Sequence, residues 1–453
     1  MKFKKVCALT LATVMAAGSL AGCGNSAGDS TSGTAESQEA GSEAEASEAT
    51  GEKPYEGVTL SVLIDSDITA AGLEAVMEAA KEKLGMSFEL ETRVGGSDGD
   101  NIVKTRLASG DMSDICVYNS GSLLAALNPA EYFIDISGEK FVSRLDDTYK
   151  ETVTIDGATY GVPFSSSQAG AILYSKPIYE ELGLTVPKTW DEFLANCDAI
   201  KAAGKTAVIG TFADSWTSQV MYLGDNYNVI SANPDFAKEF EAGTAKYAST
   251  PAGIKSFQKL ADVKKYYNED YLAATYDDGC DMMANAEGAH WVMLTQALSN
   301  IYELYGDQVN DIGVFAIPGD VPEDNGLTVW MPGSLYGNKN SENVDAVKAF
   351  MEFYVSNEAL DIYSSVVLPD GPFCIKGYQL PDNAYEGVAT DMQAYFDAGK
   401  TITALEFMTA VKGSNCASIC VEVGSGQTTA EEAAAAYDED CKKQAVQLGL
   451  NWD

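Results

Sequence analysis

The first candidates for chemistry in this sequence are a serine, a histidine and a large number of carboxylates. Residues 95–99 read Gly-Gly-Ser-Asp-Gly, which matches the G-x-S-x-G pattern of a hydrolase nucleophile between a predicted strand and a predicted helix. A serine nucleophile also needs a base, and His290 is the only histidine in the chain. The same five residues make an ordinary strand-to-helix turn with a capping aspartate. The turn is the simpler interpretation, and we predict no catalytic residue.

A glycosidase would use one carboxylic acid and one carboxylate on either side of a sugar. The chain holds 67 acidic residues, so pairs of carboxylates say nothing about such a site. Trp216, Trp291 and Trp330 would suit the cleft of a glycosidase as well as the cleft of a binding protein. No G-x-x-x-x-G-K-[ST] loop is present, which excludes an ATPase of the phosphate-loop class.

Polar residues that follow predicted strands are candidates for binding a solute. In open α/β sheets, ligands bind outside the carboxyl ends of the strands. Asp65 and Asp67 end one predicted strand, and Tyr118 and Asn119 end another. Each of these side chains could instead cap a helix or be solvated in a loop. Binding and structural roles therefore both stay open for the four residues.

A tryptophan on a polar loop is a further candidate. Trp216 follows the predicted strand 207–211 on a loop that also carries Asp214. An exposed indole presents a large apolar face, which suits stacking on the apolar face of a sugar ring. Packing inside the protein is the alternative for Trp216. Asp214 is a candidate hydrogen-bond partner for the hydroxyl groups of a neutral polyol.

The elements that would position these residues alternate between strand and helix. The dense apolar run 58–64 predicts a buried strand, and apolar residues from Leu73 to Leu84 recur at helical spacing. Segments 88–94 and 115–118 predict two more strands, with a helix over 101–109 between them. Strand, helix, strand, helix, strand is the order of a parallel sheet with right-handed crossovers.

The segment 160–201 has the clearest local pattern. An extended apolar run ending at Tyr174 precedes a short helix with Pro177 in its first turn. Thr189 and Glu192 then form a capping box, in which the hydroxyl and the carboxylate each cap a free backbone N–H. One apolar helix face follows, made of Trp190, Phe193, Leu194, Cys197 and Ile200.

The N-terminal residues have the pattern of a bacterial lipoprotein. Three lysines precede an apolar run that is too short to span a bilayer, and Leu20-Ala21-Gly22-Cys23 matches a lipobox. We therefore predict a signal peptide over 1–22 and a lipid on Cys23. Residues 23–55 are rich in Ser, Gly, Ala and Glu, so we predict a disordered linker. A net charge of −38 repels nucleic acid and anionic headgroups, so we predict no nucleic-acid partner and membrane contact through the lipid only.

The remaining cysteines leave the disulfide state open. Apart from Cys7 in the predicted signal peptide and the predicted lipid site Cys23, they are Cys116, Cys197, Cys280, Cys374, Cys416, Cys420 and Cys441. Their odd number means that at least one thiol has no partner within the chain. Cys416 and Cys420 are four residues apart, but no second Cys or His pair completes a zinc site. We predict no metal and no cofactor.

Three segments resemble those of a known family, in the same order along the chain. ILYSKPIYEELGLTVPKTWDEF at 172–193 is very similar to the signature LYYNKDLFEKAGL-PPKTWDEF of extracellular solute-binding proteins of ABC importers, the sugar-binding family that includes maltose-binding protein. LASGDMSDICVY at 107–118 resembles the family's LASGDAPDV stretch, and residues 426–433 resemble the start of its closing helix. The resemblance spans nearly everything from Val58 to the C-terminus.

The resemblance implies an α/β fold of the two-lobed, periplasmic-binding-protein-like type II class. In that fold each lobe is a mixed sheet flanked by helices, and a hinge joins the lobes. The length of the chain agrees, because it exceeds what one ordinary core supports. Aligning the signatures places the first lobe at 56–162 plus 317–366 and the second lobe at 163–316 plus 367–453.

The resemblance also implies a function. The implied protein is a monomeric lipoprotein on the extracellular face of a bacterial cell membrane. It captures a mono- or oligosaccharide between its lobes and delivers the sugar to the transmembrane subunits of an ABC permease. In the family a tryptophan at the position of Trp291 faces the ligand cleft, and Gln168 stands where maltose-binding protein has an acidic ligand contact. Trp330 completes the candidate ligand-binding set. The alternatives are a secreted carbohydrate-active hydrolase and a binding protein for another solute, such as a polyamine or a peptide.

Overall fold

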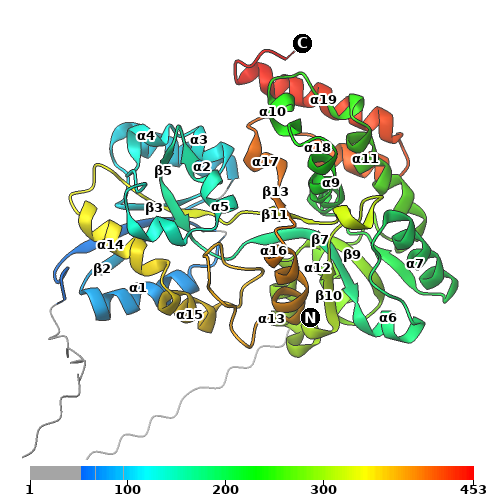
Figure 1. The fold of residues 1–453 in the computed structure, drawn as a ribbon, viewed down its shortest axis with the longest axis horizontal. Helices are drawn as coiled ribbons and strands as arrows, with labels where there is room; N and C mark the ends of the chain where they lie inside the picture. The colour runs from blue at the N-terminus through cyan, green and yellow to red at the C-terminus, as the bar shows by residue number, and fades with distance from the viewer. Residues whose placement is uncertain (1–52, 67, 95, 453) are drawn as a thin grey trace, which may run out of the picture. The chain divides into compact units, whose positions relative to one another are not determined.

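The computed structural model describes residues 53–66, 68–94 and 96–452. The predicted signal peptide, Cys23, Asp67 and all but the last three residues of the predicted linker lie outside this part of the chain. The described strands form two main sheets, each with helices packed against it (Figure 1). We call each sheet with its helices a lobe.

The first sheet has the order β2-β1-β3-β12-β6. Its strands are β1 (Thr59–Asp65), β2 (Ser87–Arg93), β3 (Ile115–Tyr118), β6 (Gly161–Pro163) and β12 (Ser334–Gly337). β1 is parallel to β2 and β3, whereas β12 is antiparallel to β3 and β6. The parallel start of the first lobe is confirmed, with strand ends within one residue of the predicted ones for β1 and β2 and at the predicted residues for β3.

Helices of the first lobe connect and cover these strands. They are α1 (Ala71–Leu84), α2 (Gly96–Ser109), α3 (Ser122–Ala125), α4 (Pro129–Tyr132), α5 (Asp147–Thr152), α14 (Val344–Tyr354) and α15 (Asn357–Val366). The predicted stripe of α1 is buried from Leu73 to Ala80 and partly buried at Leu84, and the helix ends at Gly85, whose φ of 84° is the left-handed conformation that glycine adopts readily. α1 packs beside α14 and α15, far from them in sequence (Figure 1). A small hairpin of β4 (Thr154–Ile155) and β5 (Ala158–Thr159) lies after α5.

The second sheet has the order β13-β11-β7-β9-β8, with β10 paired to β7. Its strands are β7 (Gln168–Ser175), β8 (Thr206–Ile209), β9 (Gly288–Leu294), β10 (Ile312–Phe315), β11 (Leu327–Trp330) and β13 (Thr401–Thr403). The central strand β7 is antiparallel to β9, β10 and β11, and six of its eight residues are buried. Burial on both faces explains its continuous apolar sequence.

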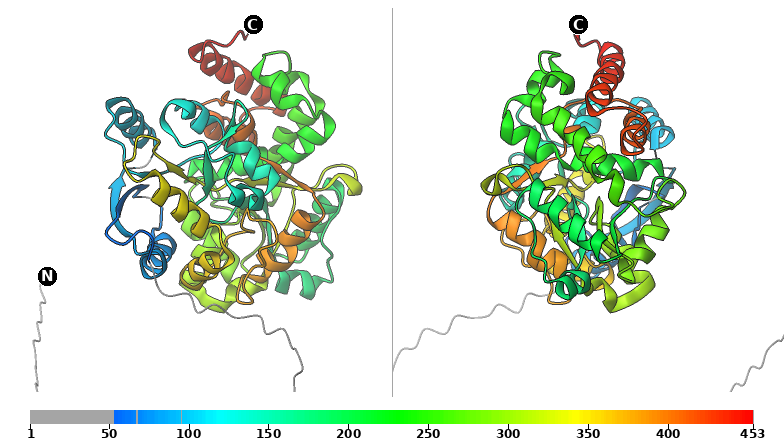
Figure 2. Two further views of the ribbon diagram at one scale, coloured as in Figure 1. Left: turned by 60° about the vertical axis from the view of Figure 1, so that its left-hand side comes forward. Right: turned by 90° about the vertical axis from the view of Figure 1, so that its right-hand side faces the viewer.

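Twelve described helices belong to the second lobe. They are α6 (Lys176–Leu182), α7 (Trp190–Ala202), α8 (Val220–Gly224), α9 (Asn226–Ala232), α10 (Phe236–Glu241), α11 (Pro251–Val263), α12 (Tyr276–Ala284), α13 (Ala297–Tyr305), α16 (Gln393–Asp397), α17 (Leu405–Met408), α18 (Cys416–Gly424) and α19 (Ala430–Gln447). The C-terminal helix α19 packs beside α11 and α18 (Figures 1 and 2). No helix of the described chain is long and apolar enough to cross a membrane.

The sheet order moves one predicted lobe boundary. We predicted a return to the first lobe at residue 317, but β11 pairs with β7 and β13 in the second sheet. The chain rejoins the first sheet only at β12, so the crossing lies at 331–333. The crossings between β6 and β7 and after α15 fall beside the other two predicted boundaries. The division into lobes stays a proposal in this amended form.

The capping of α7 differs in one detail from the predicted box. The hydroxyl of Thr189 accepts a hydrogen bond from the backbone N–H of Glu192 at 3.2 Å, as predicted. The Glu192 carboxylate, however, accepts from the N–H of Lys188 at 2.7 Å rather than from Thr189. Both bonds satisfy N–H groups at the start of the helix. Trp190, Phe193, Cys197 and Ile200 are buried, as the apolar spacing predicted.

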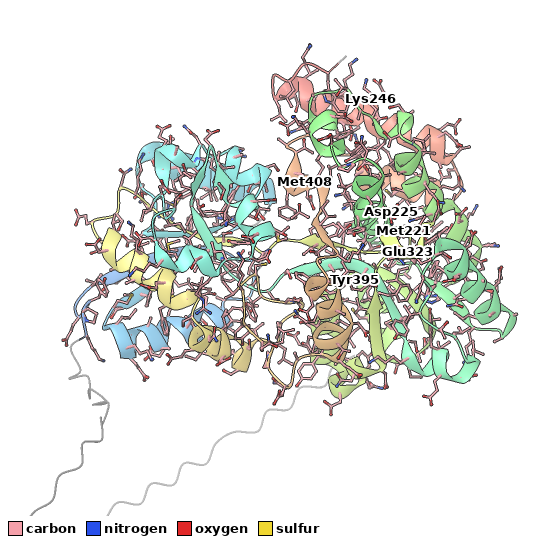
Figure 3. All side chains as sticks on the ribbon, in the orientation of Figure 1. Met221, Asp225, Lys246, Glu323, Tyr395 and Met408 are labelled. Carbon is pink, nitrogen blue, oxygen red and sulfur yellow. The ribbon has the colours of Figure 1, made fainter. Side chains whose placement is uncertain are left out.

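The second lobe contains a buried ion pair. Lys259 of α11 contacts the carboxylate of Asp225, and both side chains are 1% exposed (Figure 3 labels Asp225). Ser256 donates to the second carboxylate oxygen of Asp225 at 2.7 Å, and Lys259 also donates to the carbonyl of Pro318 at 2.7 Å. These bonds compensate the cost of burying both charges. The seven cysteines of the described chain are buried free thiols.

Candidate functional site

The candidate site is a cavity of about 670 Å³ whose walls come from both lobes. We call it the Trp330 cavity. Its lining residues are Ile68, Asn119, Ser120, Ser122, Leu123, Phe164, Ser165, Ser166, Gln168, Gln296, Trp330, Met331, Pro332, Gly333, Glu406, Phe407, Ala410, Lys412 and Gln444. The volume lies within the usual range of small-molecule sites, roughly 300–1,000 Å³.

Strand ends bring three predicted residues to this cavity. Asn119 directly follows β3, Gln168 begins β7, and Trp330 ends β11. β7 and β11 are antiparallel, so Gln168 and Trp330 are paired opposite each other in the register. Asn119 and Trp330 thus lie at the carboxyl ends of β3 and β11, as expected for open α/β sheets, whereas Gln168 lies at the amino end of β7.

Trp330 is held in place by a carboxylate that sequence reasoning missed. Its indole Nε1–H donates to Oε1 of Glu406 at 2.6 Å, and the ring is half-buried. Lys412 contacts the other oxygen, Oε2, of the same carboxylate. Both oxygens of Glu406 are thus engaged, and its charge is balanced by Lys412. The network fixes one edge of the indole, and the residue lines the cavity.

Asp65 and Tyr118 lie at predicted strand ends but do not line this cavity. Asp65 contacts Nη1 of Arg93 at 3.2 Å across the β1–β2 pair, so its carboxylate holds two strand ends together. Tyr118 is 2% exposed and donates its hydroxyl to Asp100 at 2.8 Å. Burial and that carboxylate raise the pKa of Tyr118. In this structure both residues have structural roles.

Asp214, Trp216 and Trp291 gather elsewhere, around Tyr276 at the start of α12. The Asp214 carboxylate accepts from the backbone N–H of Tyr276 at 2.7 Å and so caps that helix. The rings of Trp216 and Trp291 each lie 5.4 Å from the ring of Tyr276. Trp291 is 1% exposed, and a Cβ added at Gly279 would come within 2.5 Å of its ring. Trp291 is therefore a core residue in this structure, although we predicted that it faces the cleft.

His290 is also a core residue. Its Nδ1 lies 2.8 Å from the carbonyl oxygen of Ala207, which can only accept, so Nδ1 carries the proton. Its Nε2 then accepts from the hydroxyl of Tyr179 at 2.8 Å. Burial lowers the pKa of His290 to about 4. The imidazole is neutral and fully buried, and both of its nitrogens make hydrogen bonds within the protein. It is therefore unsuited to serve as a general base for a substrate.

The cavity also contains residues that no sequence pattern marked. Gln296 and Lys412 come from loops, Glu406 and Phe407 come from the four-residue helix α17, and Gln444 comes from the last turn of α19. Phe164, Ser165 and Ser166 could have been found, because they stand beside Gln168 in the conspicuous stretch 160–174. In the described part of the chain, no group of three or more His, Cys, Asp or Glu side chains is placed to hold a metal ion.

Comparisons with known proteins identify the family of this chain. The family model for bacterial extracellular solute-binding proteins matches residues 67–361. This chain belongs to that family. The multiple sugar-binding protein of Streptococcus mutans is 26% identical over 68% of this chain and 75% of its own length. The melibiose/raffinose/stachyose-binding protein MelE of Bacillus subtilis is 23% identical over 71% of this chain and 76% of its own.

Solved structures show the same two-lobed fold. The apo-form of RafE from Streptococcus pneumoniae aligns with a TM-score of 0.71 and 21% identity, covering 86% of this chain and all of that one (100%). RafE in complex with raffinose aligns with a TM-score of 0.64 and 22% identity, covering 85% and 100%. A chitin oligosaccharide binding protein aligns with a TM-score of 0.69 and 20% identity, covering 86% and 99%. The predicted type II periplasmic-binding-protein-like fold is confirmed.

Proposed function

We propose that this extracellular solute-binding protein captures a neutral carbohydrate in the Trp330 cavity and delivers it to the permease of an ABC importer. The observation that carries the proposal is the lining of the cavity. It combines aromatic rings with uncharged amide and hydroxyl groups: Trp330, Phe164, Phe407, Asn119, Gln168, Gln296, Gln444 and four serines. Rings stack on the apolar faces of sugars, and amides and hydroxyls bond to sugar hydroxyls in both directions.

The electrostatics of the cavity favour a neutral ligand over a polyamine. Glu406 is the only carboxylate among the described residues that line the cavity, and Lys412 balances it. A polyamine site would need negative charge that is not already balanced. A glycosidase of the usual kind would need two carboxylates facing the substrate, and the described residues of this cavity offer one that is already engaged. We therefore propose that the protein binds its sugar without turnover.

Ligand binding would close the two lobes. A sugar that contacts both walls of the cavity stabilises the closed state by its differential affinity. The permease would then recognise the closed form of a monomer that is anchored through a lipid on Cys23. Replacement of Cys23 by serine should release the protein from cell membranes into the medium.

The test is calorimetric titration of the protein with a panel of neutral sugars, polyamines and peptides. A sugar should bind, and Trp330→Ala should weaken that binding at least about tenfold, a loss of roughly 1.4 kcal/mol. Tyr302→Ala is the matched control, because Tyr302 is 40% exposed on α13 and does not line the cavity. Binding of a polyamine or peptide but no sugar would overturn the proposal. So would the appearance of sugar cleavage products.

A further inference from the structure

Two of the chain crossings between the lobes run side by side. The first lies between β6 and β7, and the third follows α15 (Figure 1). Ser166 of the first crossing forms an antiparallel bridge with Phe373 of the third. The N–H and the hydroxyl of Ser167 both donate to the carbonyl of Pro372, at 3.0 and 2.7 Å. We call these two paired segments, 164–167 and 370–373, the hinge ribbon.

Asp370 connects the hinge ribbon to a helix of the second lobe. Its backbone N–H donates to the hydroxyl of Ser166 at 3.1 Å, across the ribbon. Its carboxylate accepts a hydrogen bond from the hydroxyl of Ser299, in the first turn of α13. The Ser299 hydroxyl in turn accepts from the hydroxyl of Tyr385 at 3.3 Å. The carboxylate is thus held at the start of α13, directly after Gln296, which lines the Trp330 cavity.

The same carboxylate lies beside Gln168, another residue of the Trp330 cavity. Gln168 follows Ser166 by two residues, so the ribbon brings it next to Asp370. The Gln168 side chain forms a hydrogen bond with the Asp370 carboxylate. Because an ionised carboxylate only accepts hydrogen bonds, the Gln168 amide turns its NH2 group toward Asp370. Its carbonyl oxygen is then left to accept a hydrogen bond from a hydroxyl group in the cavity.

The surroundings of Asp370 let its charge change in mildly acidic solution. Burial raises the pKa of Asp370 from 3.8 to about 6, and the charge of Glu303 adds to the shift, whereas hydrogen bonds from Ser299 and Gln168 oppose it. Three tyrosines also lie close enough to interact with this charge: Tyr276 of α12, Tyr363 of α15 and Tyr385. Burial raises the pKa of all three phenols, to about 12 for Tyr385, so they stay neutral while Asp370 titrates.

We propose that Asp370 is a positioning residue of the sugar site, whose ionised carboxylate holds the Gln168 amide with its carbonyl oxygen toward the ligand. Asp370 is not among the described residues that line the cavity, so it acts through Gln168. A protonated Asp370 donates a hydrogen bond, the Gln168 amide turns over, and the site presents an NH2 group in place of the acceptor. Sugar capture therefore weakens in acidic surroundings. This inference rests on the proposed carbohydrate function and adds a pH dependence to it.

The test measures sugar affinity as a function of pH. The probe is whichever of glucose, galactose, xylose, N-acetylglucosamine or their disaccharides and trisaccharides binds the wild-type protein most tightly at pH 8. If only the ionised form binds, a pKa of about 6 makes the affinity fall about tenfold between pH 8 and pH 5. An affinity that stays constant or rises at pH 5 would overturn the inference and leave the proposed function intact. Absence of binding by all of these sugars at every pH would overturn both.

Proton release gives a second measurement on the unmodified protein. At a pH equal to the pKa, half of the Asp370 carboxyls are protonated, and a ligand that selects the ionised form expels these protons. Calorimetric titration at pH 6, in buffers with different heats of ionisation, should show release of about half a proton for each sugar bound. At pH 8 the release should be close to zero. Binding at pH 6 without proton release would contradict the proposed role of Asp370.

Variants test whether Asp370 acts through Gln168. Asp370→Asn cannot ionise, so it should bind with equal affinity at pH 5 and pH 8 and at least about tenfold more weakly than the wild type at pH 8. Gln168→Ala should also lose the pH dependence, because no amide remains to be positioned. The matched control is Asp391→Asn, which removes a half-buried carboxylate with a raised pKa that accepts from the N–H of Val314, outside the cavity. It should keep the wild-type pH dependence. A Gln168→Ala variant that retains the fall in affinity would overturn the inference.

Discussion

Replacing Trp291 with alanine should unfold the second lobe at a lower temperature rather than remove a ligand contact. Trp291 lies in β9 with 1% of its surface exposed, and its ring packs against Tyr276 and over Gly279. The substitution removes a whole indole from a closed core and leaves a hole that its neighbours fill only in part. Such changes cost about 3–5 kcal/mol.

That loss converts into a measurable shift. A cooperative unit of about 250 residues has an unfolding entropy near 0.5 kcal/mol/K, so 3–5 kcal/mol lowers Tm by roughly 6–10 °C. Calorimetry of the wild type, Trp291→Ala and Trp330→Ala without ligand tests this. Trp330→Ala should shift Tm much less, because Trp330 is half-buried at a cavity wall. Suppose that Trp291→Ala keeps the wild-type Tm but loses sugar binding. Trp291 would then be a ligand contact, and the reasoning from burial would be refuted.

Three further predictions concern buried or capping groups. Burial lowers the pKa of His290 from 6.5 to about 4. As the pH falls from about 6.5 to about 4, the imidazole becomes protonated in the unfolded chain before it does so in the folded protein, and the folded protein loses stability. Between pH 7 and pH 4 the wild type should lose roughly 2–3 kcal/mol more than His290→Gln in denaturant unfolding; equal slopes would contradict the assignment. Lys259→Met should cost about 3–5 kcal/mol by leaving Asp225 buried without its cation. The double variant with Asp225→Leu should recover part of that loss, and no recovery would argue against the pairing. Thr429→Ala removes the hydroxyl that accepts from the N–H of Glu432 at the start of α19 and should cost about 1 kcal/mol in the same assay, whereas an unchanged midpoint would mean that the cap contributes nothing.

Part of the candidate site could be predicted from the sequence. Asn119 was predicted from the end of an apolar run and Gln168 from the family resemblance, and both line the cavity together with the predicted Trp330. Asp214 and Trp216 also follow a strand, β8, yet they pack around Tyr276. Whether a residue after a strand faces a ligand depends on which helix packs there. That packing is not encoded in the local pattern.

The capping of α7 also shows what a local sequence pattern can and cannot predict. The pattern Thr189-x-x-Glu192 predicted where the helix begins, because both side chains can accept hydrogen bonds from free N–H groups at the N-terminal end of a helix. It did not fix which N–H the carboxylate would take, since Lys188 and Thr189 are both within reach. Local sequence selects the set of possible partners, and the backbone geometry selects one of them.

The sequence by itself predicted β1, β2 and β3, the start of α7, the family and three residues of the cavity, since apolar periodicity, caps and linear motifs are local properties. Only the tertiary structure placed β11 in the second sheet, buried Trp291, and brought Glu406 and Lys412 to Trp330. These facts depend on contacts between segments many residues apart. The physical reason is that burial and ion pairing are decided by all the neighbours of a side chain at once, and most of those neighbours are distant in sequence.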